Sequence, residues 1–90
     1  MACDELTYSG VDAAKWALAK ETISREYGMH IESERGEEAK SGFTLAWTYD
    51  PSAETLVIRC REKPFLIPCG VVNNRINALA AQCGVEPAAS

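Results

Sequence analysis

Cysteine is the residue type with the clearest chemical potential in this chain, and Cys69 has the most suggestive position. It follows Pro68 in the stretch Ile-Pro-Cys-Gly, where a helix is expected to begin. Unpaired N–H groups and the helix dipole at such a place favour the thiolate, which is the nucleophilic form. Cysteine catalysis normally also needs a base within hydrogen-bond reach, and His30 is the single histidine of the sequence. Because nothing in the sequence brings the two together, Cys69 is a weak catalytic candidate. The alternative is a small buried residue where a strand turns into a helix.

The cysteines and carboxylates lack the spacing of a metal site. No two cysteines are two or three positions apart, as they would be in a zinc or redox pair. We therefore expect four reduced thiols, two of them (Cys60 and Cys83) at apolar positions. The acidic residues do not follow the pattern of calcium ligands, so we expect solvated charges and neither metal nor cofactor. The acidic residues in question are Glu32, Glu34, Glu37 and Glu38.

Composition indicates an ordinary globular chain. It has 90 residues, of which 47% are hydrophobic and 24% charged. We expect a single domain over residues 1–90, with a thin core because a chain this short buries only about 60–65% of its unfolded surface. No apolar run approaches the roughly 20 residues that cross a bilayer, and the first ten residues lack the features of a signal peptide. The expectation is a cytoplasmic protein with no membrane contact.

The charge is acidic. Thirteen acidic residues against nine basic ones give a net charge of −4. Gripping a phosphate backbone needs clustered Lys and Arg, so we expect no nucleic-acid partner.

A β-hairpin is the element that the sequence predicts most clearly. Residues 43–49 and 55–61 each alternate apolar and polar side chains, and Asp50 and Pro51 suit a type I turn between them. The apolar positions are odd-numbered before the turn and even-numbered after it, so a four-residue loop at 50–53 places all of them on one face. This register pairs Trp47 with Leu56, Leu45 with Ile58 and Phe43 with Cys60.

Two helices should position this hairpin. The first is predicted over about residues 10–27, with Ser9 as N-cap and Gly28 as the left-handed residue that ends it. It carries a second apolar stripe, which either contacts a further element of the fold or forms an interface with another chain. The second helix is predicted over about 69–83 and ends before Gly84. It begins with Pro68 at its first position, or later with Asn73 as N-cap.

The order of elements predicts a two-layer α+β fold, with both helices on one face of a small antiparallel sheet. Residues 29–34 alternate weakly and are the candidate for a third, edge strand. Residues 35–42 are polar and glycine-containing, which indicates a solvated loop. Residues 1–8 and 85–90 are expected to be flexible tails.

The outward face of the hairpin is the candidate binding surface. A mildly apolar strip beside two arginines is typical of a modest protein interface, including a homodimer. The alternative is a solvated sheet face that is rich in Thr because Thr suits strands. The candidate residues are Thr44, Ala46, Thr48, Val57, Arg59 and Arg61.

These observations favour a small non-enzymatic interaction module over an enzyme. The expected partner is another protein or a second copy of the chain, bound through the outer sheet face or an edge strand. A small-molecule binding protein is the first alternative, with a pocket between Trp16, Tyr27 and Trp47. A thiol enzyme that uses Cys69 is the second.

Overall fold

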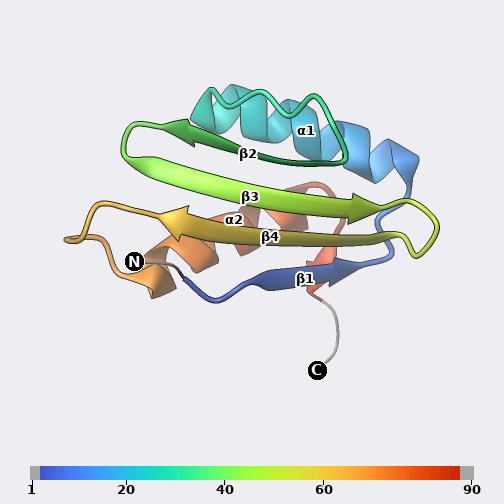
Figure 1. Cartoon of the computed structure of the whole chain (residues 1–90). Coiled ribbons are helices and arrows are strands. Elements are labelled where there is room, and N and C mark those ends of the chain that lie inside the picture. Colours follow the sequence, from blue (N-terminus) through green and yellow to red (C-terminus); the bar gives the residue numbers. More distant parts are fainter. Residues whose placement is uncertain (1–2, 88–90) are drawn as a thin grey trace.

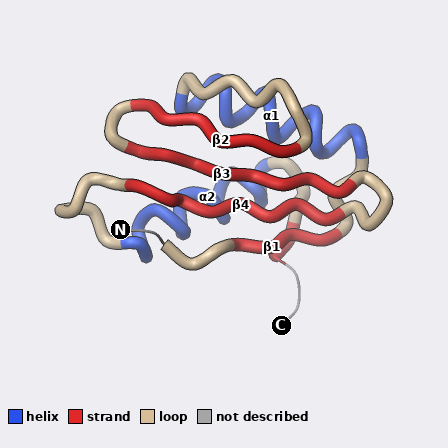
Figure 2. The backbone as a smooth tube through the Cα atoms, viewed as in Figure 1, coloured by secondary structure: helices blue, strands red, loops and turns tan. Residues whose placement is uncertain are grey.

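The computed structural model describes residues 3–87, which form a two-layer α+β domain (Figures 1 and 2). Both helices lie behind one face of an antiparallel sheet and leave the other face open (Figure 1). The strand order is β2-β3-β4-β1-β5. The predicted fold class is confirmed. The elements are β1 (Leu6–Ser9), α1 (Ala13–Tyr27), β2 (Arg35–Lys40), β3 (Phe43–Asp50), β4 (Thr55–Glu62), α2 (Cys69–Gln82) and the two-residue β5 (Glu86–Pro87).

The central hairpin β3-β4 has the predicted inner face, but the predicted pairing is wrong by two residues. Trp47 lies opposite Ile58, not Leu56. The reason lies in the turn. Asp50 stays in β3 opposite Thr55, and its carboxylate accepts hydrogen bonds from the Ser52 and Ala53 N–H groups at 3.0 and 3.2 Å. A shift by two residues preserves which side chains face inward, so burial alone could not distinguish the two registers.

The core lies between the inner face of the hairpin and the two helices. Trp16 of α1 stacks on Tyr49 of β3 with ring centroids 4.7 Å apart. The Tyr49 hydroxyl donates a hydrogen bond to the Val11 carbonyl at 2.8 Å, and Trp47 Nε1 donates to the Ser33 carbonyl at 2.9 Å. Trp47 and Tyr49 therefore bury their rings and still satisfy their polar atoms.

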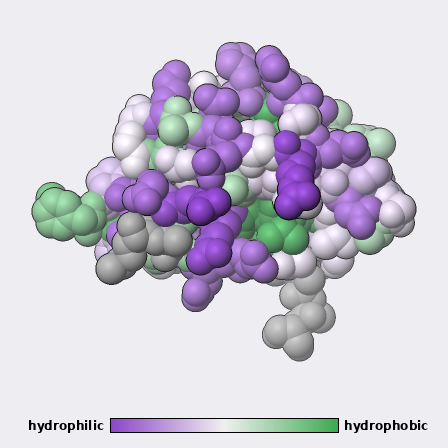
Figure 3. Space-filling view, viewed as in Figure 1, coloured by the Kyte–Doolittle hydropathy of each residue, from purple (hydrophilic) through white to green (hydrophobic). Residues whose placement is uncertain are grey.

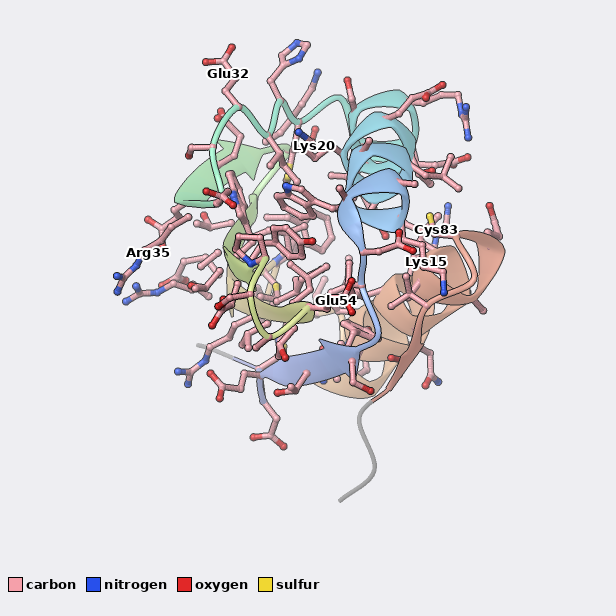
Figure 4. The ribbon with its side chains drawn as sticks, turned by 90° about the vertical axis from the view of Figure 1, so that its right-hand side faces the viewer. Lys15, Lys20, Glu32, Arg35, Glu54 and Cys83 are labelled. Atoms are coloured by element: carbon pink, nitrogen blue, oxygen red, sulfur yellow. A yellow bond between two sulfur atoms is a disulfide. The ribbon has the colours of Figure 1, made fainter. Side chains whose placement is uncertain are left out.

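Helix α1 begins three residues later than predicted. Ser9 belongs to β1, and the N-cap is Asp12, whose carboxylate accepts the Lys15 N–H at 2.8 Å. Gly28 ends the helix with a φ of 68°, as predicted. The second apolar stripe consists of Val11, Ala14 and Leu18; Val11 is buried, whereas Ala14 is exposed and Leu18 is 42% exposed. The helix contacts α2 elsewhere, where the buried Cys83 lies between the two helices (Figure 4) and its thiol donates to Thr22 Oγ1 at 3.5 Å.

The prediction of flexible tails at residues 1–8 and 85–90 is wrong for the described part of both. Residues 6–9 form β1, which pairs with β4, and the Cys3 N–H donates to the Cys60 carbonyl at 2.8 Å. Tyr8 is fully buried, and Val85 is buried as well. A strand of four residues is too short for its alternation to be recognised in the sequence. Residues 1–2 and 88–90 lie outside the described part.

The edge strand was predicted in the wrong place. Residues 29–34 are a connection, and the polar stretch that was expected to be a loop supplies strand β2, Arg35–Lys40. Ser41 and Gly42 join β2 to β3 with φ values of 55° and 85°, which is the pattern of a two-residue hairpin turn. Because nearly all β2 side chains are exposed, burial imposes no apolar alternation on this strand.

Helix α2 begins at Cys69 with Pro68 as its N-cap, so the later start at Asn73 is excluded. Pro68 takes an extended conformation with a ψ of 149°, which places it just before the first helical residue and not at that position. Gly84 follows the helix with a φ of 74°, and this fits its predicted role at the end of the helix.

Candidate interaction surface

The open face of the sheet brings the predicted binding residues together. Thr48 lies opposite Val57, and Ala46 lies opposite Arg59, so their side chains share the face that the helices leave free. Thr44, at the bulged end of the pair, lies opposite Glu62. A shallow depression of about 210 Å³ runs along this face; it is lined by Glu5, Ala46, Trp47, Thr48, Val57, Arg59 and Arg61.

Arg59 and Arg61 on this face already have partners within the chain. Arg59 Nε donates to the Cys3 carbonyl at 3.0 Å, and Arg61 Nε lies 3.4 Å from a carboxylate oxygen of Glu37 on β2. The Arg61–Glu37 pair is largely exposed, so it contributes little to stability. These contacts hold the two arginine side chains beside the strip formed by Ala46, Thr48 and Val57.

Charged side chains dominate the visible surface of this face. Figure 3 shows hydrophilic residues over most of it and a small apolar area near its centre. Arg35 of β2 extends away from the domain into solvent (Figure 4). The open face is therefore a polar surface with a small apolar centre.

Cys69 lies at the first residue of α2, as predicted, but the expectation of four reduced thiols is wrong. Its sulfur forms a disulfide with Cys3, 66 positions earlier in the chain. A sulfur in a disulfide is not a nucleophilic thiolate, so in this state Cys69 has no catalytic thiol. The pairing could not be predicted from the sequence, because Cys3 lies in a segment without a periodic pattern.

The two remaining thiols are buried. Cys60 and Cys83 are free cysteines, and burial raises the pKa of the Cys60 thiol. A raised pKa keeps the thiol protonated and poorly reactive. Both residues fill apolar positions, as the sequence predicted.

His30 and the neighbouring carboxylates lie around a shallow hollow at the surface. His30 is exposed on the connection before β2, and Glu32, Glu37 and Glu38 line the same shallow surface hollow with it. Over residues 3–87, no group of three or more metal-ligating side chains lies close enough together to hold an ion.

Of the three residues predicted to line a pocket, Trp16 and Trp47 are buried and Tyr27 is half-buried. Trp16 is occupied by its stacking on Tyr49, and Lys20 lies 5.5 Å above the Trp16 ring, where the ammonium group interacts with the aromatic face. A separate void of about 30 Å³ between the helices and the sheet is lined by Tyr27 but by neither tryptophan.

A larger groove lies at one end of the domain, between the end of α1 and the start of α2. Its volume is about 200 Å³. Arg75 is its one charged residue. Burial raises the pKa of the half-buried Tyr27, and the positive charge of Arg75 partly lowers it again. The groove is lined by Tyr27, Met29, Phe43, Leu45, Ile67, Val71, Val72, Arg75 and Ile76.

The loop between β4 and α2 carries the largest exposed apolar side chains among residues 3–87. Phe65 is 87% exposed and Leu66 is 80% exposed. The sequence does not mark them as binding residues, because a run of three apolar residues predicts burial. Only the folded structure shows that Phe65 and Leu66 are exposed, because the core forms without these two side chains.

Comparison with known proteins assigns no family. No family model matches the chain, and neither a curated protein nor a solved structure is similar to it. In residues 3–87, no helix is both long enough and apolar enough to cross a membrane.

Proposed function

We propose that this chain is a small non-enzymatic interaction module that binds another protein, or a second copy of itself, through the open face of its sheet. The observation that carries the proposal is the one-sided cover of the sheet: both helices lie on one face, and the other presents a depression around Ala46, Thr48 and Val57. An apolar centre with a polar rim is the usual anatomy of a modest interface.

The open face is a better candidate than the edge strands. β2 forms one edge, and four of its six residues are charged, which discourages the addition of a further strand. β5, beyond β1, has two residues, the second of which is a proline that cannot donate to a ladder. Pairing along an edge would therefore be short or poorly satisfied.

The Val57→Glu substitution tests the open face. Val57 is half-buried on that face, so a carboxylate there projects into the depression and leaves the inner core unchanged. We expect it to weaken association with the partner, or self-association, by about 30-fold or more. Glu32→Gln, outside the face, is the control. Binding that survives Val57→Glu at full strength would show that the open face is not the interface.

Binding of a small molecule is the second candidate function, and the groove at the end of α1 favours it. At about 200 Å³ the groove is smaller than the roughly 300–1,000 Å³ of most ligand pockets. A bound ligand would raise the melting temperature, and the rise would increase with the logarithm of the ligand concentration above the dissociation constant.

The expected cytoplasmic location can be tested through the Cys3–Cys69 disulfide. Cytosolic thiols are kept reduced, so the disulfide counts against a cytoplasmic location. Alkylation of thiols in intact cells followed by mass measurement would reveal the state of the pair. A cytoplasmic chain should carry all four cysteines as thiols, whereas protection of Cys3 and Cys69 from alkylation would contradict that location.

A further inference from the structure

We propose that the loop of residues 63–68 and the adjacent groove form a two-fold interface between two copies of this chain, with Phe65 of each copy in the groove of the other. This inference rests on the proposed function only in treating the chain as an interaction module. It uses a different surface and leaves the open sheet face free for another partner.

The loop presents its apolar side chains away from the core. It projects beyond the end of the sheet (Figure 1), and Figure 3 shows a hydrophobic projection at that end. Phe65 and Leu66 together expose roughly 300 Å² of apolar surface, since an aromatic side chain alone presents about 150–250 Å². A monomer gains nothing from this exposure, whereas an interface would remove the surface from water.

The backbone of the loop is already held in place. The Ile67 N–H donates to the Pro64 carbonyl at 3.0 Å, so Phe65 and Leu66 lie at the tip of a closed turn. Pro68 caps α2 directly afterwards, and the disulfide of Cys69 ties the start of the helix to the N-terminal segment. A pre-ordered loop loses little conformational entropy on binding.

The groove matches this loop in size and polarity. A cavity of about 150 Å³ lined by apolar side chains accommodates benzene, so a groove of about 200 Å³ has room for the Phe65 ring. Val71, at its rim, is 58% exposed and would be covered by the incoming loop. Ile67 belongs to both features, which places loop and groove side by side on one molecule.

This adjacency favours a second copy as the occupant. When a projection and a matching groove lie next to each other, a two-fold axis between them pairs both at once and closes the assembly at two chains. The two loops would together remove roughly 600 Å² of apolar surface from water, and the groove walls that they cover must supply the rest of the ~1,200 Å² at which specific interfaces begin. A lipid surface is a poorer match, because the chain has a net charge of −4 and Lys63 is the only basic residue of the loop.

Sedimentation equilibrium of the whole chain and three variants tests the interface. We expect a dimer in the micromolar range for the natural chain, and at least about 30-fold weaker association for Phe65→Ser and for Val71→Glu. Leu18→Ser, which removes an exposed leucine from α1, is the matched control and should leave the dimer unchanged. Mixing the Phe65→Ser and Val71→Glu chains should restore a weaker dimer, because one intact loop then meets one intact groove.

Several results would overturn the inference. A natural chain that remains monomeric at about 1 mM has no such interface. A dimer that Phe65→Ser and Val71→Glu leave intact, but Val57→Glu disrupts, would refute the loop interface and support the sheet face. Binding of a monomer to phosphatidylcholine vesicles that is lost in Phe65→Ser would assign the loop to lipid instead.

Discussion

Two groups of large apolar side chains in this small domain have opposite surroundings. Trp47 and Tyr49 on β3 are buried, and their polar atoms are hydrogen-bonded to backbone carbonyls. Phe65 and Leu66, 15 or more positions later, are almost fully exposed on a closed turn. The same hydrophobic effect acts on both, but only the first group obtains its burial within the chain. Stability and association are therefore expected to depend on separate residues.

Replacement of Trp47 by alanine should have the largest effect on folding. The substitution removes the ring from the inner sheet face, leaves a cavity and leaves the Ser33 carbonyl without its indole partner. We expect a loss of about 3–5 kcal/mol in the free energy of unfolding. Urea unfolding followed by circular dichroism measures it, and a loss below about 1 kcal/mol would mean that this side chain does not belong to the core.

Loss of the Cys3–Cys69 disulfide should have the next largest effect. The bond closes a long stretch of chain, from the N-terminal segment to the start of α2. Replacing both cysteines with serine should lower the free energy of unfolding by about 2–4 kcal/mol, mainly by releasing the unfolded chain. Urea unfolding should show this loss, and a reducing agent should destabilise the natural chain similarly but leave the double variant unchanged. Equal stability of the two chains would contradict this role.

High pH should lower the free energy of unfolding, because Tyr8 is buried. Burial raises the pKa of Tyr8 from 10.0 to about 12, while its hydroxyl donates to Asn77 Oδ1 at 2.7 Å. Because the folded chain resists ionisation, the contribution of Tyr8 is fully present below pH 10 and is lost as the pH rises towards 12. Unfolding measured from pH 8 to 12 should show this decline, and Tyr8→Phe should make it shallower. The same slope in both chains would exclude Tyr8 as a cause.

The contrast between the two groups also explains what the sequence could predict. The β3-β4 hairpin, its inner face and both helices follow from periodicity, because burial on one face leaves a regular pattern. β2 was missed because its side chains are exposed on both faces, and β1 because four residues are too few to show alternation. The alternation of apolar residues permits hairpin registers that differ by two residues. The turn geometry around Asp50 decides between them, and the sequence does not show that geometry.

The candidate site could also be predicted only in part. The residues chosen on the hairpin do share one open face, because alternate positions of paired strands must do so. The disulfide depends on a contact between Cys3 and Cys69, and no local pattern records a contact over that separation. The exposure of Phe65 is likewise a property of the completed core, since the same side chain would be buried if one more element covered it.

The claim that stability and association depend on separate residues is tested most directly by measuring both on one variant, Phe65→Ser. Unfolding should be measured well below the dissociation constant, so that dimer formation does not add to stability. The account predicts a free energy of unfolding within about 0.5 kcal/mol of the natural chain together with at least about 30-fold weaker self-association. A variant that loses more than about 1.5 kcal/mol of stability and associates as the natural chain does would place Phe65 in the core and contradict the account.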